Sequence, residues 1–484
     1  MSVKVNIIGA GLAGLSTGIY LQGKGIETEI FEMAPWAGGM CTAWKRNGYR
    51  FDGCIHWMVG TRPGDPAYKL YREVDALTGS TKIYNAGVIR MEIDGVMYKV
   101  PLTFDAFRDF LLKAGKGDEK WIGAFMKEIR AIMRSELPMG MPGSPGEAVH
   151  MLAKSMGFLR LGKKYMGTTV EAYVREVKSG LVKEVIFQLM SREFSAIGLL
   201  MMLGTRMSGN AGYPLEGAEG VTRRMVEKYK GLGGKLTLNA RVEKIVVEGG
   251  AAKGVVVKGT PYPSDYVVAA CDAYDTLANM LEGKYPHPQI DGLLKNAPLF
   301  HPLALVSFGL DKHFDIPFAV TYECREGIKT SPDTVGHSFS LRSFDFDKSA
   351  APRGGSSVMA MIGAPLAYWQ NLRESDMAQY KKEKQNLADA IAEAVEERLP
   401  GFRAAIRVTD VSTPATYVRL TNVYRGSFEG FAPVPASLKM RIAKTLPGLE
   451  RFYMCGQWTT AGGGICTAVS DGKQAAHKIL KEIK

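Results

Sequence analysis

Three glycines near the N-terminus, Gly9, Gly11 and Gly14, have the spacing GxGxxG of a phosphate-binding turn. In a strand–turn–helix unit, the first glycine allows the tight turn and the second lets a pyrophosphate reach the backbone. The third lets the helix pack on the strand. The start of the helix supplies free N–H groups and a partial positive charge. Glu32 lies 18 residues after Gly14, where its carboxylate can accept hydrogen bonds from ribose hydroxyls. These residues predict a dinucleotide site.

This chemistry needs a strand before the glycines, a helix after them and a second strand that ends at the acid. Residues 3–8 read as a buried strand, and Leu15, Ile19 and Leu21 follow a helical pattern. Residues 28–31 read as the second strand. With all parts in register, the pattern is more specific than the glycines alone. A glycine-rich packing turn is the alternative.

A second glycine pair, Gly38 and Gly39, follows Glu32 closely and precedes the stretch YRFDGCIHW at residues 49–57. A nicotinamide-binding domain would continue here into its next helix and strand, whereas this chain stays rich in glycine and polar residues. Another close approach of the backbone so soon after the ribose acid suits a longer cofactor. We therefore predict FAD, extended across the domain.

A third glycine-rich stretch, GQWTTAGGGICTAVSDG at residues 456–472, precedes the last predicted helix. A short strand is expected at 452–455, and three consecutive glycines occupy 462–464. Ordering such a triplet costs conformational entropy. The stretch is therefore either a flexible terminal loop or a place where a ligand touches the backbone.

Together these motifs resemble the glutathione-reductase-like FAD superfamily that includes the amine oxidases. Within it, the sequence is most similar to phytoene desaturases, carotenoid isomerases and retinol saturases. One departure is the order Asp52-Gly53-Cys54, where the family has its glycine one residue later. The resemblance implies an α/β fold, with a discontinuous Rossmann-like FAD-binding domain and an α+β substrate domain of mixed sheet and helices. The expected boundaries are 1–76, 212–285 and 439–484 for the FAD-binding parts, and 77–211 and 286–438 for the substrate parts.

The resemblance also implies which residues bind FAD. The C-terminal glycines would lie beside the isoalloxazine ring, and the backbone near Val242 would contact adenine. Gln457 stands where related proteins often have an acid, and we expect it to hydrogen-bond the ribityl chain. The expected cofactor-binding residues are Gly9, Gly11, Leu12, Ala13, Gly14, Glu32, Gly38, Gly39, Met40, Val242, Gly456, Gln457, Gly463, Gly464 and Ile465.

No catalytic triad or carboxylate pair is evident, and none is required, because a flavin carries the hydride chemistry itself. The candidates for lining the flavin or substrate are His56, Trp57 and Trp458. Arg419 either faces the substrate or pairs structurally. The six cysteines show no CxxC or Cys/His ligand spacing, so we expect reduced thiols and no metal.

Composition excludes several classes of protein. The chain is 46% hydrophobic and 23% charged, as in globular proteins, and carries a formal net charge of +12. No run of Lys and Arg is interleaved with aromatic residues, so we expect no nucleic-acid partner. No apolar stretch is long enough to cross a bilayer. The N-terminus runs straight into a strand, and we expect a cytoplasmic protein.

Residues 77–211 are mostly helical in pattern, and eleven of the 24 methionines lie between Met126 and Met207. Methionine suits a pocket for a long apolar ligand, and a loosely packed helical core is the alternative. Residues 150–167 are basic and amphipathic, which predicts peripheral contact with a membrane or else a solvated helix face. The apolar residues expected to share one side are Met151, Leu152, Met156, Leu159 and Leu161.

Three functions remain open. The first is an FAD-dependent oxidoreductase that desaturates, saturates or isomerises carbon–carbon bonds of a hydrophobic polyene, isoprenoid or lipid. The second is a flavin amine oxidase. The third is a binding protein of the GDP-dissociation-inhibitor type, which shares the fold and holds prenylated partners without a flavin. The intact glycines and Glu32 argue against this third function.

Overall fold

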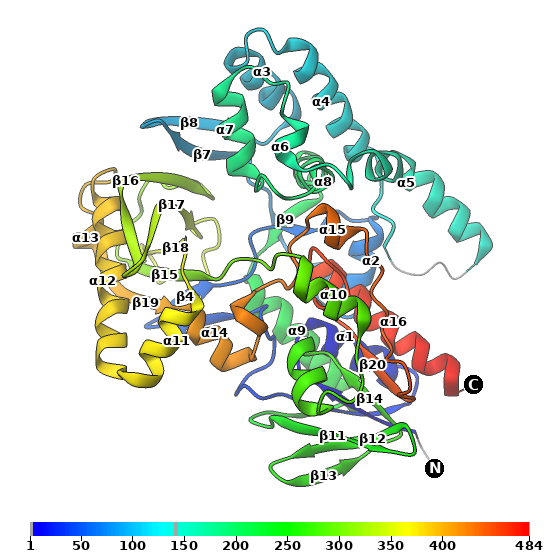
Figure 1. Ribbon diagram of the computed structural model, residues 1–484. Helices are drawn as coiled ribbons and strands as arrows, with labels where there is room; N and C mark the ends of the chain where they lie inside the picture. Colours follow the sequence, from blue (N-terminus) through cyan, green and yellow to red (C-terminus); the bar gives the residue numbers. More distant parts are fainter. Residues whose placement is uncertain (1–2, 140–143, 484) are drawn as a thin grey trace.

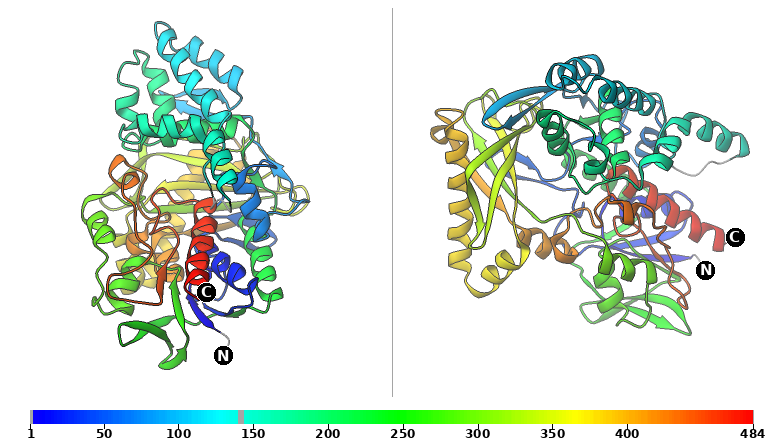
Figure 2. Two further views of the ribbon diagram at one scale, coloured as in Figure 1. Left: turned by 90° about the vertical axis from the view of Figure 1, so that its right-hand side faces the viewer. Right: turned by 45° about the horizontal axis from the view of Figure 1, so that its top comes forward.

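The computed structural model describes residues 3–139 and 144–483, which form three parts that meet at the centre of the molecule (Figure 1). A five-stranded parallel sheet with its helices lies at the bottom, a helical part at the top, and a seven-stranded sheet at the left. The two further views keep this arrangement and show helix α5 projecting from the rest (Figure 2).

The five-stranded sheet has the order β10-β2-β1-β14-β20, and all of its strands are parallel. The chain contributes strands to it at its start, near its middle and close to its end, as the expected discontinuous domain requires. Short apolar runs form these strands, and helices cover them. The strands are β1 (Lys4–Ile8), β2 (Glu27–Phe31), β10 (Lys235–Thr237), β14 (Tyr266–Ala269) and β20 (Phe452–Met454).

Helix α1 (Leu12–Gln22) packs against both α9 (Gly217–Gly231) and α16 (Ile465–Ile483). The approach of α1 to α16 is close, because a Cβ on Gly472 would lie 2.3 Å from the Ala13 carbonyl oxygen. Blue α1 and red α16 lie side by side in Figures 1 and 2. A small antiparallel sheet adjoins this part and consists of β11 (Val242–Glu248), β12 (Ala251–Val257) and β13 (Thr260–Pro263).

The segment expected to be mostly helical begins instead with strands. β7 (Val88–Ile93) and β8 (Val96–Pro101) form a hairpin that joins the seven-stranded sheet, because β7 pairs with β16. Helices follow from residue 104. They are α3 (Phe104–Ala114), α4 (Glu119–Met133), α5 (Pro145–Tyr165), α6 (Val170–Tyr173), α7 (Gly180–Leu189) and α8 (Ala196–Met207).

The seven-stranded sheet has the order β19-β15-β18-β17-β16-β7-β8. Helix α12 (Met377–Glu396) covers it and buries Leu387, Ile391 and Val395. The remaining strands are β15 (Leu303–Leu310), β16 (Val320–Ser331), β17 (Thr334–Ser343), β18 (Ser356–Gly363) and β19 (Ile406–Ser412).

Short elements connect the three parts. The short strands are β3 (Ala43–Arg46), β4 (Tyr49–Asp52), β5 (Met58–Val59), β6 (Ile83–Tyr84) and β9 (Ala211–Pro214). The helices are α2 (Pro66–Glu73), η1 (Asp275–Met280), α10 (Pro288–Asn296), α11 (Leu366–Ser375), α13 (Phe402–Ala405), α14 (Pro414–Thr421), η2 (Tyr424–Gly426) and α15 (Pro435–Leu438).

The prediction that five apolar residues of 150–167 share one side of a helix is wrong for Leu161. Leu161 is buried in the helical part, whereas Leu152 is 55% exposed. The two residues are nine positions apart, about two and a half turns, and therefore lie on opposite sides of α5. The exposed stripe consists of Val149, Leu152, Met156 and Leu159. Within the described residues, no helix combines the length and apolarity needed to cross a membrane.

Candidate functional site

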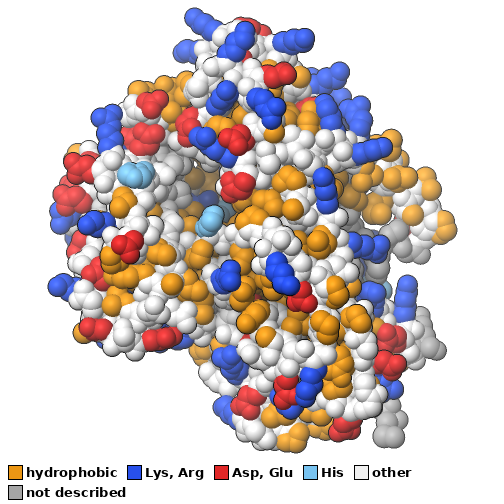
Figure 3. Space-filling view, in the orientation of Figure 1, with side chains coloured by type: hydrophobic (Ala, Val, Ile, Leu, Met, Phe, Trp, Pro, Cys, Tyr) orange, Lys and Arg blue, Asp and Glu red, His pale blue; other side chains and the backbone are white. Residues whose placement is uncertain are grey.

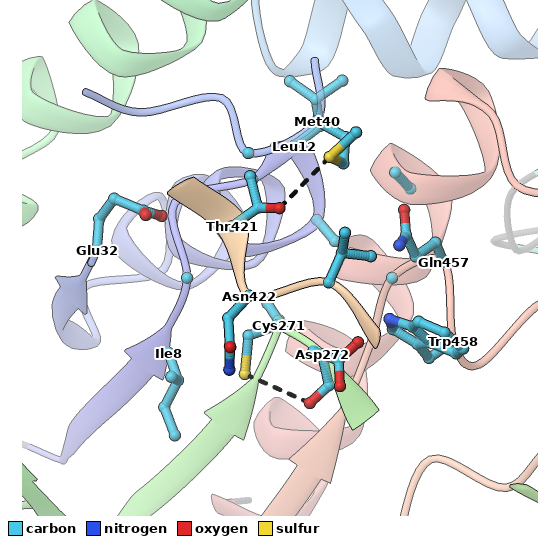
Figure 4. Close-up of a pocket in the computed structure, with 18 of the residues that line it drawn as sticks. Ile8, Leu12, Glu32, Met40, Cys271, Asp272, Thr421, Asn422, Gln457 and Trp458 are labelled. Carbon is cyan, nitrogen blue, oxygen red and sulfur yellow. Dashed lines mark hydrogen bonds between the residues drawn. The ribbon is translucent and has the colours of Figure 1, made fainter. Parts of the chain in front are cut away.

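A pocket opens at the carboxyl edge of the five-stranded sheet, where open α/β sheets bind their ligands. Its empty volume, including the open mouth, is about 1200 Å³. The ends of β1, β2, β14 and β20 all contribute to its wall. In Figure 4, Glu32 and Trp458 lie on opposite sides of the pocket, with Thr421 and Asn422 between them.

The three N-terminal glycines occupy three different environments. Gly9 has φ +97°, and a Cβ there would lie 2.9 Å from the Ala270 carbonyl oxygen. Gly11 precedes α1 in an extended conformation, and a Cβ there would meet no protein atom within 4 Å. A Cβ on Gly14 would lie 2.0 Å from the Gly9 carbonyl oxygen. Gly14 therefore serves helix packing and is absent from the pocket wall, whereas Gly11 leaves space for a ligand.

The second glycine pair packs directly on the first turn. Gly38 donates its N–H to the Ala10 carbonyl oxygen at 2.9 Å, and a Cβ on Gly39 would lie 3.3 Å from the Gly11 Cα. Both glycines line the pocket with Met40. The Met40 sulfur accepts a hydrogen bond from the Thr421 hydroxyl at 3.5 Å (Figure 4).

The Glu32 carboxylate is 5% exposed at the end of β2. Its Oε2 accepts the Ala10 N–H at 2.7 Å, and its Oε1 accepts the Ala34 N–H at 2.9 Å. Burial raises the pKa of Glu32, against the lowering effect of these backbone donors. Each oxygen has a second lone pair, so the side chain is fixed in place and can still accept hydrogen bonds from a ligand.

The C-terminal loop is held by Asp471 of α16. The Asp471 carboxylate pairs with the Lys444 ammonium and accepts the Gly456 N–H at 2.8 Å and the Thr459 hydroxyl. Asp471 and Lys444 are both buried. This network fixes the start of the segment 456–458, in which Gly456, Gln457 and Trp458 all line the pocket.

The glycine triplet divides between two roles. Gly464 lines the pocket with Ile465, and a Cβ there would meet nothing within 4 Å. Gly463 is absent from the pocket wall and packs against Glu429, because a Cβ there would lie 3.0 Å from the Glu429 Cβ. The structure therefore places Gly464, and not Gly463, beside the ligand space.

The other predicted site residues fall both inside and outside the pocket. Leu12, Ala13 and Val242 belong to its wall, and so does Trp458, whose ring packs edge-on against Phe431 at 5.3 Å. Arg419 is exposed on α14 and does not reach the pocket. His56 and Trp57 are also absent from the wall, although Cys54, two residues before His56, is part of it.

Glu429 is a wall residue that the sequence pattern did not reveal. Burial raises the pKa of its carboxyl from an ordinary value of 4.5 to about 7. It lies between Phe428 and Gly430, where nothing in the local sequence distinguishes it from a surface acid. Asp272 is a second such residue, and burial raises its pKa to about 6, although its carboxylate accepts the N–H groups of Asp275 and Tyr424.

Comparison with known proteins identifies the family. Residues 12–480 match the family of flavin containing amine oxidoreductases. The chain belongs to this family. It is 24% identical to a lycopene-forming phytoene desaturase of Pseudescherichia vulneris, over 99% of this chain and 100% of the relative. It is 22% identical to a chloroplastic prolycopene isomerase of Daucus carota, over 99% of this chain and 80% of the relative.

Solved structures agree in fold. Cyclohexylamine oxidase from Brevibacterium oxydans IH-35A superposes with a TM-score of 0.63 at 15% identity, covering 100% of both chains. An oxidoreductase from Methanosarcina mazei superposes with a TM-score of 0.62 at 16% identity, covering 98% of this chain and 100% of that one. The chain is thus a flavin-dependent oxidoreductase with a Rossmann-like domain and a mixed-sheet substrate domain.

The pocket of this flavoprotein fits FAD, the cofactor that its family implies. The open space at Gly11 lies at the N-terminus of α1, where backbone N–H groups can bind a phosphate. The open space at Gly464 lies at the N-terminus of α16, where they can contact the flavin. Glu32 has free lone pairs for a ribose. These residues would hold the ADP half beside β1 and β2 and the flavin half beside residues 456–465.

Replacing Gly11 by valine tests the phosphate end of the pocket. The added methyl groups enter space that no protein atom fills. The fold should therefore persist, while FAD affinity falls about 10- to 100-fold. Titration with FAD followed by flavin fluorescence measures the change. Gly123→Val, at an exposed position of α4 with open space around it, is the matched control. Wild-type affinity in Gly11→Val would contradict the assignment.

Replacing Glu429 by glutamine tests the desolvated carboxyl in the pocket wall. Because folding raises its pKa, Glu429 contributes stability that is fully present below pH 4.5 and is lost as pH rises through about 7. From pH 4.5 to 7, the unfolding free energy of the wild type should fall by up to about 3 kcal/mol relative to Glu429→Gln. Urea unfolding at saturating FAD measures this difference. Exposed Glu450→Gln is the control. Parallel pH profiles for wild type and Glu429→Gln would refute the raised pKa.

Proposed function

We propose that this flavoprotein binds FAD and oxidises, reduces or isomerises carbon–carbon bonds of a hydrophobic polyene or isoprenoid molecule. The observation that carries the proposal is an aromatic path leading away from the flavin end of the pocket. Phe428, in the pocket wall, lies 5.2 Å from Phe300, which lies 5.6 Å from Phe194 at the edge of the helical part. A row of rings suits a long apolar ligand. Similarity to carotenoid desaturases and isomerases along almost the whole chain supports the same class of substrate.

The chain's own residues would position the substrate and manage protons. Bound FAD would supply hydride transfer. Trp458 and Ile465 present apolar surface at the flavin end, which excludes water from that end of the pocket. Glu429 lies at the same end, and with a pKa of about 7 its carboxyl can hold or release a proton near neutral pH. Such a group is useful when a carbon–carbon bond is isomerised or saturated.

Two alternative functions, amine oxidase and prenyl-binding protein, would require different ligands in this site. An amine oxidase binds an amine, which is cationic at neutral pH. Two desolvated arginines, buried Arg342 and partly buried Arg206, lie near the segment that follows Cys54 and disfavour a cation there. A binding protein of the GDP-dissociation-inhibitor type needs no flavin, and the open space at Gly11 and Gly464 argues against it.

Substrate oxidation and flavin absorbance distinguish these functions. We expect the purified protein to show the visible bands of bound flavin. Anaerobic incubation of the oxidised protein with phytoene, or of the dithionite-reduced protein with retinoate, should change the polyene spectrum. Cyclohexylamine and putrescine should leave the oxidised flavin unreduced. Glu429→Gln should slow the polyene reaction by about 100-fold if its proton is used. Reduction of the flavin by an amine alone would establish the amine oxidase. A colourless protein that takes up no FAD would leave only the binding protein.

We also propose that α5 contacts an anionic membrane surface from which the substrate enters. Its exposed stripe, Val149, Leu152, Met156 and Leu159, forms the apolar patch at the right of Figure 3. Exposed basic residues Lys154, Arg160 and Lys163 accompany it, whereas Lys164 pairs with Glu128 at 3.0 Å. Apolar and basic residues together are typical of interfacial helices.

Sedimentation with liposomes tests this contact. Binding should rise with anionic lipid and fall with salt, since each basic residue near such a surface contributes about 1 kcal/mol. Replacing Lys154, Arg160 and Lys163 by glutamine should weaken binding at least tenfold. The same change at Lys381, Lys382 and Lys384 of α12 is the control. Equally poor binding to anionic and neutral liposomes would exclude the membrane route.

A further inference from the structure

Arg342 of β17 is a buried cation whose hydrogen-bonding groups are not satisfied. Its residue surface is 9% exposed, and its Nε and Nη1 atoms are buried without a hydrogen-bond acceptor. A buried polar group without a partner is costly, and a buried charge more so. A native protein retains such a group when something else completes it or when function requires it.

Arg206, at the end of α8, adds a second cation to the same place. Its guanidinium carbon lies 5.7 Å from the centre of the Phe318 ring, and that of Arg342 lies 5.6 Å from the same ring. Burial lowers the pKa of Arg206 to about 10, and burial together with the charge of Arg206 lowers the pKa of Arg342 to about 9. Contact with an aromatic face stabilises a cation but accepts none of its in-plane N–H groups.

No acid in the described part of the chain forms an ion pair with Arg206 or Arg342. Asp52 is the acid that attracts Arg342, but its carboxylate already accepts four hydrogen bonds. The donors are the backbone N–H groups of Cys54, Ile55 and Ala218 and the hydroxyl of Tyr213. By contrast, buried Arg50 pairs with Asp347 at 2.5 Å. Among the described residues, buried Arg50 thus has an internal anion, whereas buried Arg342 and partly buried Arg206 have none.

His56 packs beside Trp57, with ring centres 6.2 Å apart, and is close enough to both arginines to be affected by their charges. Burial first, and then the charges of Arg342 and Arg206, lower the pKa of His56, which keeps the imidazole neutral and able to donate one N–H. His56, Trp57 and Arg206 each keep part of their surface accessible. His56 and Arg206 are nevertheless strongly desolvated. His56 follows Cys54, a residue of the pocket wall, by two positions in the chain.

We propose that Arg206, Arg342 and His56 bind an oxyanionic group, a carboxylate or phosphate, at one end of an otherwise apolar substrate. An oxyanion supplies the acceptors that the guanidinium groups lack, and arginine binds such groups through paired N–H donors. The rings of Trp57 and Phe318 beside the cations provide apolar walls for the adjoining chain. The inference rests on the proposed function and narrows it, because the preferred polyene or isoprenoid then carries an acidic end.

Calorimetric titration of the FAD-loaded protein with dodecanoate, dodecyl phosphate, dodecanol and inorganic phosphate tests the site. We expect at least one alkyl anion to bind about tenfold or more tightly than dodecanol. Arg342→Met should abolish that preference and leave dodecanol binding unchanged. It should also be at least as stable as the wild type, since it removes an unpaired buried charge. Arg206→Met is a second variant with the same expected loss, and exposed Arg353→Met is the control that keeps the preference.

The outcomes separate this inference from the proposed function, because no turnover is measured. Equal affinity for dodecanol and both alkyl anions would overturn the inference, as would an undiminished preference in both Arg342→Met and Arg206→Met. Inorganic phosphate binding as tightly as the alkyl anions would overturn the assignment to a substrate end and leave a site for a free anion. None of these results would alter flavin absorbance or polyene conversion, on which the proposed function depends.

Discussion

The contact between α1 and α16 is the constraint on which the rest of this molecule depends. The helices approach so closely at Gly472 that any side chain there would overlap the α1 backbone. Side chains of α1 bond to the backbone of α16. Ser16 donates to the Val469 carbonyl at 2.7 Å, and Thr17 to the Gly472 carbonyl at 3.2 Å. Because each helix begins beside the pocket, this contact brings the glycine turn at residues 9–14 and the loop at residues 456–464, from opposite ends of the chain, to one cavity.

Buried carboxylates fix the loops that line the pocket, because they accept hydrogen bonds from the backbone of those loops. Asp471 holds the C-terminal loop through Lys444, Gly456 and Thr459. Asp52 does the same for the segment after β4, since it fixes Cys54 and Ile55 and links them to Tyr213 and α9. A buried ion that is fully hydrogen-bonded orders its surroundings, whereas losing one partner leaves an uncompensated charge. Arg342 differs from these carboxylates, because two of its guanidinium nitrogens are buried without a hydrogen-bond acceptor.

The three parts of the molecule contribute differently to the site. The five-stranded sheet supplies the cofactor pocket, and the seven-stranded sheet and the helical part supply Arg342 and Arg206. The hairpin β7–β8 joins the sheet from a segment whose sequence pattern predicts mostly helix. Neighbouring strands in a sheet need not be neighbours in sequence, so periodicity within one segment cannot reveal which sheet it extends.

The sequence by itself determined what depends on short-range backbone geometry. Gly9, Gly11 and Gly14 have the distinct environments that their spacing implied, and Glu32 ends its strand as expected, because a turn and its glycines are specified within a few residues. Tertiary packing alone decided three other features. These are which glycine of 462–464 lines the pocket, the position of Arg419 outside the pocket, and which side of α5 is buried. Glu429 and the cluster of Arg206, Arg342 and His56 are likewise products of packing. The environments of these side chains are formed by segments far apart in the chain. A local sequence pattern therefore cannot predict them.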